Sequence, residues 1–188
     1  MHDIEPYYNW RHLYTAEEDS QSPFYGREYS EFEFSNTVYN YYIHPQWDEI
    51  GSRTLYVKIL MCDYELGFAI MELIGEWNDA IENDIQTLKR NVIDQLQHEG
   101  IFKFILIAEN VLNFHSGDRE YYEEWYNECA ERGGWLVCLN TPEQTLCEFR
   151  QARLSSYIHF MINPNWRSLN PMLLFEKTDN DILRLLPG

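Results

Sequence analysis

The strongest constraint on the fold is an alternation of strand-type and helix-type patterns through the middle of the chain. Residues 102–110, FKFILIAEN, are mostly apolar, which is typical of a strand buried on both faces of a helix-covered parallel sheet. The next segment, 118–134, predicts a helix that ends at a Gly-Gly pair. One stripe of this helix collects its larger apolar residues, Tyr122, Trp125, Tyr126, Cys129 and Ala130. Residues 135–140, WLVCLN, predict the next buried strand.

Two strands and a helix are predicted before this unit. The apolar runs 54–62 and 68–75 are separated by DYELG, which suits a hairpin loop. Residues 78–100 then carry a helical apolar stripe, with Asn83 and Gln86 spaced as a capping box and a glycine at the end. The members of this stripe are Ile81, Ile85, Leu88, Val92 and Leu96.

A third helix is predicted after the last buried strand, and a tail follows it. Thr141 is expected to be the N-cap, with Pro142 at the first helical position and Gln144 completing a capping box. The tail, 161–188, is interrupted by prolines and asparagines, and we expect loops with one short helix or strand near MLLFEK. The whole order favours an α/β fold with a largely parallel sheet and right-handed crossovers.

The amino-terminal segment differs in composition from the rest. Residues 1–53 hold thirteen of the thirty aromatic residues, with ten acidic and three basic side chains. The stretch SEFEFSNTVYNYYI suggests one or two strands. We expect the aromatic side chains to pack on the main domain or on a second copy of the chain, because large exposed apolar patches are uncommon on monomers. The predicted organisation is an extension at 1–53, a core at 54–160 and a tail at 161–188.

Charge and hydropathy exclude several classes of protein. Thirty-one acidic residues against fourteen basic ones give a net charge of −17, which disfavours binding to nucleic acid or to anionic membranes. The excess of acidic residues would serve either to keep the protein soluble or to bind a basic partner protein. The amino terminus has no secretory signal pattern, and no apolar run approaches the length of a membrane span. We therefore expect a cytoplasmic protein.

Candidate sites for catalysis or metal binding are sparse. Six histidines are scattered without a metal-ligand spacing, and four cysteines without a CxxC pair are expected to be reduced, buried hydrophobes. No GxSxG, P-loop or GxGxxG pattern occurs, so we predict no catalytic residues, no metal and no cofactor. His115 beside Ser116 could suggest an activated serine, but neighbours in a loop seldom face each other. Glu109 and Asn110 end a predicted strand, where they would line a small-molecule crevice or terminate the strand.

The middle of the chain resembles the STAS domain, the family of bacterial anti-sigma-factor antagonists. The resemblance covers about residues 54–160 and is carried by the order of elements and by three motifs. These are the turn Gly75-Glu76-Trp77-Asn78 before the first helix, the loop before the second helix, and the Gly-Gly turn before a strand that ends in Asn140. Members have an Asp-Ser-x-Gly loop, whereas this chain has His115, Ser116, Gly117 and Asp118, so only the serine aligns.

The resemblance implies a non-catalytic protein-interaction module in a partner-switching pathway. Ser116 would be the phosphorylation site, and a kinase or an anti-sigma-like protein would be the partner. Asn78, Asp79, His115, Gly117 and Asp118 would lie at the partner-facing edge. A simpler interpretation is that Ser116 or Asp118 caps the second helix. A different class of function is an assembly module that has lost the switch and forms a homodimer through its aromatic extension.

Overall fold

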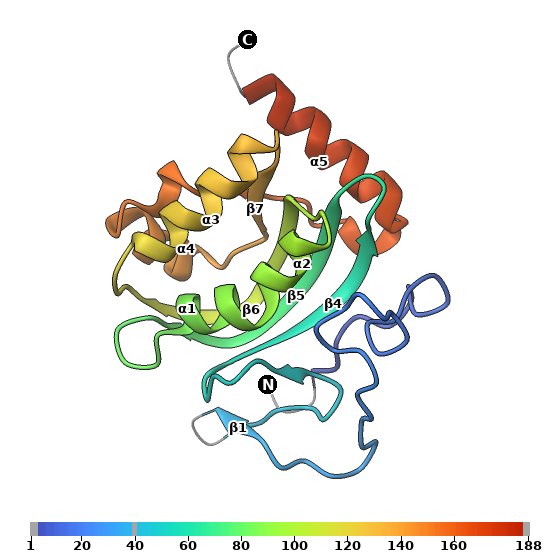
Figure 1. The fold of residues 1–188 in the computed structure, drawn as a ribbon. Helices are drawn as coiled ribbons and strands as arrows, with labels where there is room; N and C mark the ends of the chain where they lie inside the picture. The colour runs from blue at the N-terminus through green and yellow to red at the C-terminus, as the bar shows by residue number, and fades with distance from the viewer. Residues whose placement is uncertain (1–3, 39–40, 186–188) are drawn as a thin grey trace.

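The protein is organised around a six-stranded mixed sheet with the strand order β3-β4-β5-β6-β7-β8. In this computed structural model, which describes residues 4–38 and 41–185, β3, β4 and β5 are antiparallel and β5 to β8 are parallel (Figure 1). The strands are β3 (Asp48–Glu49), β4 (Leu55–Asp63), β5 (Phe68–Asn78), β6 (Lys103–His115), β7 (Trp135–Leu139) and β8 (His159–Met161). The predicted α/β fold with a largely parallel sheet is confirmed.

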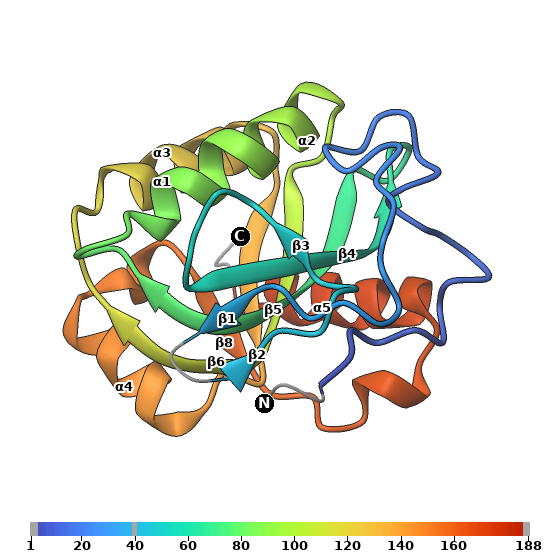
Figure 2. The ribbon, with the colours of Figure 1, turned by 90° about the horizontal axis from the view of Figure 1, so that it is seen from below.

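Helices cover both faces of this sheet. The first helical segment is α1 (Asp84–Leu88), continued by a π-helical stretch (Lys89–Ile93) and α2 (Asp94–His98), and it is followed along the chain by α3 (Glu120–Glu131), α4 (Glu143–Gln151) and α5 (Pro171–Leu185). Figure 2 shows α1, α2 and α3 on one side of the sheet and α5 on the other. Short 3-10 turns lie at Leu154–Ser156 and Trp166–Ser168. From β4 to α4, the element order is the one that the STAS resemblance implies, so the fold is STAS-like.

Two hydrophobic cores separate the sheet from these helices. On the first face, the buried stripes of α1, α2 and α3 pack on side chains of β4, β5 and β6, and Phe149 of α4 joins them. On the second face, Leu174, Phe175 and Ile182 of α5 pack on β5, β6 and β7. Every residue of β5 is buried, as expected for a central strand covered on both faces.

The first helix begins later than the sequence pattern predicts. Ile81 lies in the preceding loop and is 79% exposed, whereas the other four members of the predicted stripe are fully buried. The Asn83 side chain does not cap the helix, so the predicted capping box is wrong. The carboxylate of Asp79 takes that role, because its Oδ1 accepts the backbone N–H of Ile85 at 2.8 Å. Sequence patterns for helix caps pair a side chain with an N–H two or three residues later, so they do not identify Asp79, which lies six residues before Ile85.

The carboxyl-terminal third also differs from the prediction. The tail contains the fifteen-residue helix α5 rather than one short element, and its Asn170 side chain accepts the N–H of Leu173 at 2.8 Å while Pro171 occupies the first position. The proline that suggested a break is therefore at a helix start. In α4 the N-cap residue is Pro142 without a side-chain cap, so the predicted Thr141 cap is wrong.

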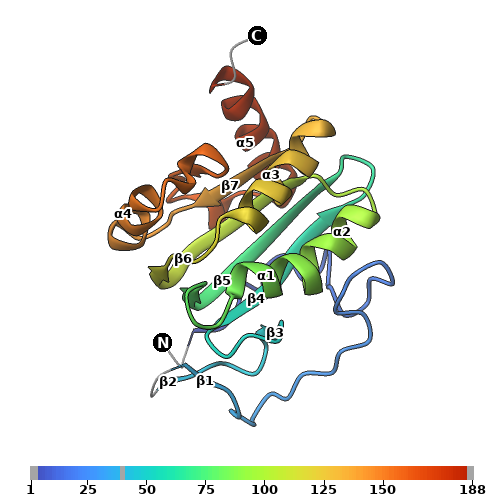
Figure 3. The same ribbon diagram turned by 60° about the vertical axis from the view of Figure 1, so that its left-hand side comes forward.

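The amino-terminal segment packs against both faces and one edge of the sheet. Of its three short strands, β1 (Thr37–Val38) and β2 (Tyr41–Tyr42) pair with each other, whereas β3 pairs with β4 and forms an edge of the main sheet. Trp10 joins the core under α5, whereas Phe24 joins the core under α1 to α3. Figure 3 shows this segment, with its own strand β3, beside β4, at the edge of the sheet far from β7.

Candidate functional site

Two loops meet at the carboxyl edge of β5 and β6. The last residues of these strands, Asn78 and His115, pair in register, so the chain leaves both strands at the same place. The carbonyl oxygen of His115 accepts the backbone N–H groups of Asp79 at 2.9 Å and Ala80 at 3.3 Å. The loop before α1 and the loop before α3 are thus joined by backbone hydrogen bonds.

Gly117 brings these loops into direct contact. A Cβ atom at this position would lie 2.7 Å from the carbonyl oxygen of Asp79, closer than real contacts allow. Only glycine permits such an approach without a shift of the backbone. Gly117 was a predicted partner-facing residue, and in the structure it holds the Ser116 loop against the preceding one.

Ser116 is exposed and lies between two open hollows. One hollow, of about 530 Å³, lies over Asp79, Ile81 and Gly117, and the other, of about 400 Å³, lies between the loop and α4. Asp118 lines the first hollow and His115 lines the second. We call this region the Ser116 surface, defined by Ala80, Ile81, His115, Ser116, Gly117 and Asp118.

Neither Ser116 nor Asp118 caps the following helix. The N-cap residue of α3 is Arg119, and no side chain makes a cap hydrogen bond there. The interpretation of this serine as a helix cap is therefore wrong. Since the loop continues for three residues after Ser116 before the helix begins, the hydroxyl is too early in the chain for the N-cap position.

Asp79 is the structural centre of the site. Its carboxylate accepts hydrogen bonds from Trp77 Nε1 at 3.0 Å, from Ile85 N at 2.8 Å and from the Tyr122 hydroxyl at 2.5 Å. Burial raises the pKa of Asp79 to about 7, although the hydrogen bond from Tyr122 opposes the rise. This side chain therefore ties β5, α1 and α3 together beneath the exposed loops.

Two further predicted partner-facing residues are held by contacts within the chain. Asn78 is buried, and its Oδ1 accepts the N–H of Ile81 at 3.1 Å. His115 is half-exposed, and its Nε2 lies 2.6 Å from the buried carboxylate of Glu76. The imidazole is thus engaged with β5, and this pairing offers no support for its use as a base toward Ser116.

Glu109 and Asn110 lie within β6 and not at its end, so the predicted strand end at these residues is wrong. Two donors reach Glu109 Oε1, Asn140 Nδ2 at 2.7 Å and Trp166 Nε1 at 2.8 Å. The guanidinium of Arg167 lies 2.7 Å from Glu109 Oε2. Protein donors thus already surround this carboxylate.

A second carboxylate, Glu72, is buried near Glu109 on the α5 face. Its Oε2 accepts the backbone N–H of Tyr7 at 2.8 Å, and Arg167 lies 3.7 Å from Oε1. Burial raises the pKa of Glu72 to about 7, and the negative charge of Glu109 adds to the rise. Protonation of this group is therefore linked to folding near neutral pH.

Replacing Glu72 by Gln should flatten the pH dependence of stability. The pKa of Glu72 is higher in the fold than its ordinary value of 4.5, so its contribution is complete below about pH 4.5 and is lost as pH rises through about 7. We expect the free energy of unfolding of Glu72→Gln, relative to the wild type, to increase by about 2–3 kcal/mol from pH 5 to pH 8. Denaturant unfolding at the two pH values measures this difference. The exposed Glu65→Gln serves as the control, and equal pH profiles for Glu72→Gln and wild type would contradict the prediction.

Three carboxylates between α2 and α3 have the spacing of a metal site but already surround a cation. The oxygens of Asp94, Glu124 and Glu128 lie within 4.8 Å of one another. The Lys89 ammonium, which is fully buried, lies 2.8 Å from Glu128 and also contacts Asp94. Because Lys89 and Arg90 of the π-helical stretch together pair with these carboxylates, the cluster fits a helix-pairing role.

The cysteines divide into two groups. Cys62, Cys129 and Cys138 are buried and free, and burial raises the pKa of each thiol to about 12. Cys147 is exposed on α4, in contrast to the prediction that all four are buried. Among residues 4–38 and 41–185, no helix has both the length and the apolar character needed to cross a membrane.

Comparisons with known proteins find similarity at the level of structure. No protein-family profile and no curated protein matches the sequence. A protein from Thermotoga maritima, described as an anti-sigma factor antagonist, is 16% identical over 63% of this chain and 91% of its own, with a TM-score of 0.45. The anti-sigma factor antagonist SpoIIAA in its unphosphorylated form is 11% identical over 70% of this chain and 99% of its own, with a TM-score of 0.48.

The phosphorylated form of the Bacillus cell fate determinant SpoIIAA is a third similar structure. It is 11% identical over 65% of this chain and 98% of its own, with a TM-score of 0.43. At these values the likeness concerns fold alone and carries no information on activity. The functional argument therefore depends on the residues of this chain.

Proposed function

We propose that this protein is a regulatory protein-interaction module whose Ser116 surface binds a protein partner. Support comes from one arrangement: an exposed serine between two open hollows, on loops held by buried hydrogen bonds. A surface for recognition benefits from loops on a rigid scaffold, because less conformational entropy is lost on binding. The bacterial and cytoplasmic setting is part of the proposal and follows from the STAS resemblance.

We propose that the Ile81 side chain anchors the partner protein, a role that the sequence did not predict. This side chain is 79% exposed and lines the same hollow as Ser116, Gly117 and Asp118. Protein interfaces bury an apolar core within a polar rim, and Ile81 would supply apolar area to that core. The apolar spacing had suggested a buried helix face, so no local signal distinguished Ile81 from the rest of its stripe.

Phosphorylation of Ser116 is the proposed switch. A phosphate adds about −1.5 to −2 charges at neutral pH. It would enter a surface that already carries Asp118, and the first turn of α3 adds Glu120 and Glu123. The bulk and the negative charge of the phosphate would then weaken binding of the partner. We propose a kinase or an anti-sigma-like protein as this partner.

Replacing Ser116 by Asp should weaken partner capture. An aspartate carries less charge than a phosphate, so we expect about a tenfold loss of affinity, or about 1.4 kcal/mol. Ser116→Ala should bind as the wild type does, because it adds neither bulk nor charge. The measurement is affinity purification from native cells with phosphosite mapping, followed by titration calorimetry with the partner that is recovered.

A matched control separates this effect from added charge in general. Ser20 is also exposed and lies in the amino-terminal segment, so Ser20→Asp should leave binding unchanged. Equal capture by the wild type and by Ser116→Asp would contradict the switch. Partner binding that survives both Ser116→Asp and Ile81→Ser would overturn the assignment of the Ser116 surface.

A further inference from the structure

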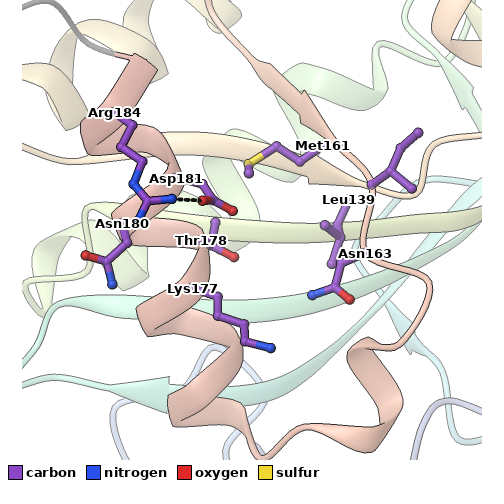
Figure 4. A pocket seen from close by; sticks show the side chains of 9 residues that line it. Leu139, Met161, Asn163, Lys177, Thr178, Asn180, Asp181 and Arg184 are labelled. Carbon is purple, nitrogen blue, oxygen red and sulfur yellow. Dashed lines mark ion pairs between the residues drawn. The ribbon is translucent and has the colours of Figure 1, made fainter.

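A further hollow, apart from the two at the Ser116 surface, lies between the carboxyl-terminal half of α5 and the outer strands of the sheet. It has a volume of about 370 Å³, and its apolar wall includes Leu139 of β7 and Met161 of β8. Figure 4 shows Lys177 and Arg184 of α5 near opposite ends of this hollow. The next residue after β8, Ile162, also lines the hollow and is 83% exposed. We call this hollow the α5 groove.

The α5 groove is cationic within a strongly acidic protein. Among residues 4–38 and 41–185, Arg184 pairs only with the exposed Asp181, at 3.6 Å, and Lys177 has no ion pair. An exposed i,i+3 pair is weak in water, so both cations remain able to bind other carboxylates. A groove with an apolar wall and two such cations suits an apolar side chain flanked by acidic ones.

The chain itself carries a segment with this chemistry. Residues 31–34 read Glu-Phe-Glu-Phe and belong to no helix or strand. The Phe32 ring is 85% exposed, whereas Phe34 stacks edge-on against His44. The Ser30 hydroxyl accepts the N–H of Phe32 at 3.2 Å and that of Glu33 at 2.9 Å, and this turn presents the segment at the surface.

We propose that residues 31–34 of one copy bind the α5 groove of a second copy. Phe32 would cover the apolar wall, and its two glutamate neighbours would face Lys177 and Arg184. These cations are seven residues apart on a helix, or about 10 Å along its axis. Two glutamates at positions i and i+2 are at most about 7 Å apart along the chain, and their flexible side chains span the difference.

The contact between residues 31–34 and the α5 groove forms between two copies of the protein and not within one chain. Residues just before the segment are fixed at β3, where Arg27 lies 3.3 Å from Asp48 and the Tyr29 hydroxyl donates to the same carboxylate at 2.5 Å. The α5 groove lies at β8, five strand spacings away, or about 24 Å. Since the two surfaces are different and lie at opposite edges, they join copies head to tail, in a ring or an open chain. This assembly does not require the Ser116 surface.

Sedimentation velocity over a range of protein concentrations tests the proposal. At low ionic strength we expect the full-length protein to form larger species as concentration rises, and added salt to dissociate them. Phe32→Ser should shift this association to at least tenfold higher concentration. Tyr25→Ser is the matched control, because Tyr25 is also an exposed aromatic residue of the same segment and lies outside the proposed contact.

A charge exchange identifies the two surfaces. Lys177→Glu/Arg184→Glu and Glu31→Lys/Glu33→Lys should each be monomeric alone, because each places like charges in the contact. Their equimolar mixture should associate again, since every contact between unlike copies then joins opposite charges. A wild type that remains monomeric at hundreds of micromolar, or a mixture that does not associate, would overturn the proposal. Circular dichroism verifies that each variant is folded.

Discussion

Asp79→Ala is expected to cost about 3–5 kcal/mol of folding stability. The change leaves three donors, Trp77 Nε1, Ile85 N and the Tyr122 hydroxyl, without their acceptor. Each unsatisfied buried donor costs about 1–3 kcal/mol, and relaxation or water entry recovers part of the total. Denaturant unfolding followed by tryptophan fluorescence and by circular dichroism measures the loss.

The neighbouring Asp118→Ala provides the control. Asp118 is an exposed acid of the same surface, so its replacement should change stability by no more than about 0.5 kcal/mol. Asp79→Asn adds a second comparison, because the amide keeps one acceptor oxygen and should be less damaging than alanine. A loss below about 1 kcal/mol for Asp79→Ala would show that other groups satisfy these donors.

Gly134→Ala is expected to destabilise the fold by about 3 kcal/mol or more. A Cβ atom there would lie 1.9 Å from the carbonyl oxygen of Phe102 and 2.6 Å from its carbon. These are backbone atoms of the residue just before β6, and Trp135 N donates to the same oxygen at 3.1 Å, so they cannot move aside without disturbing the strand pairing. Overpacking usually lowers the free energy of unfolding by about 1–3 kcal/mol, and a clash with backbone atoms reaches or exceeds the upper end of this range.

Gly133→Ala is a matched substitution one residue earlier. Gly133 has a φ of 69° with no atom within 4 Å of its Cβ position, so alanine there meets only the left-handed backbone penalty of about 1 kcal/mol. Thermal and chemical unfolding of the two variants should therefore differ clearly. Equal losses at both positions would contradict the steric argument for Gly134.

Regular elements with strong periodicity were predictable because their patterns are local. The apolar runs became β4, β5, β6 and β7, and the stripes around Trp125 and Leu88 became buried helix faces except at Ala130 and Ile81, which are exposed. The Ser116 loop was also found from the sequence, as the polar stretch between a buried strand and a helix, and the STAS resemblance supplied only the role of the serine. The capping assignments for Asn83, Thr141 and Ser116 were wrong, because a cap depends on where the backbone leaves the helix.

The sequence did not predict the length of the carboxyl-terminal helix α5 because the residues at its start are ambiguous. Asn170 and Pro171 are typical of both a loop and a helix start. The α5 face that follows is apolar at Leu174, Phe175 and Ile182, and only its packing on the sheet decides between the two structures. The cationic groove beside this helix was equally hidden, since Leu139 and Arg184 are far apart in the chain.

By itself, the sequence determined the α/β class, the order of the central elements, the acidic surface and the position of one serine in a loop before α3. These properties follow from hydrophobic periodicity, charge count and local turn residues. Tertiary structure alone decided that Asp79 is buried among three donors, that Ile81 is exposed, and that Gly117 joins two loops. These depend on contacts between residues distant in sequence, and no local pattern encodes how closely two backbones approach.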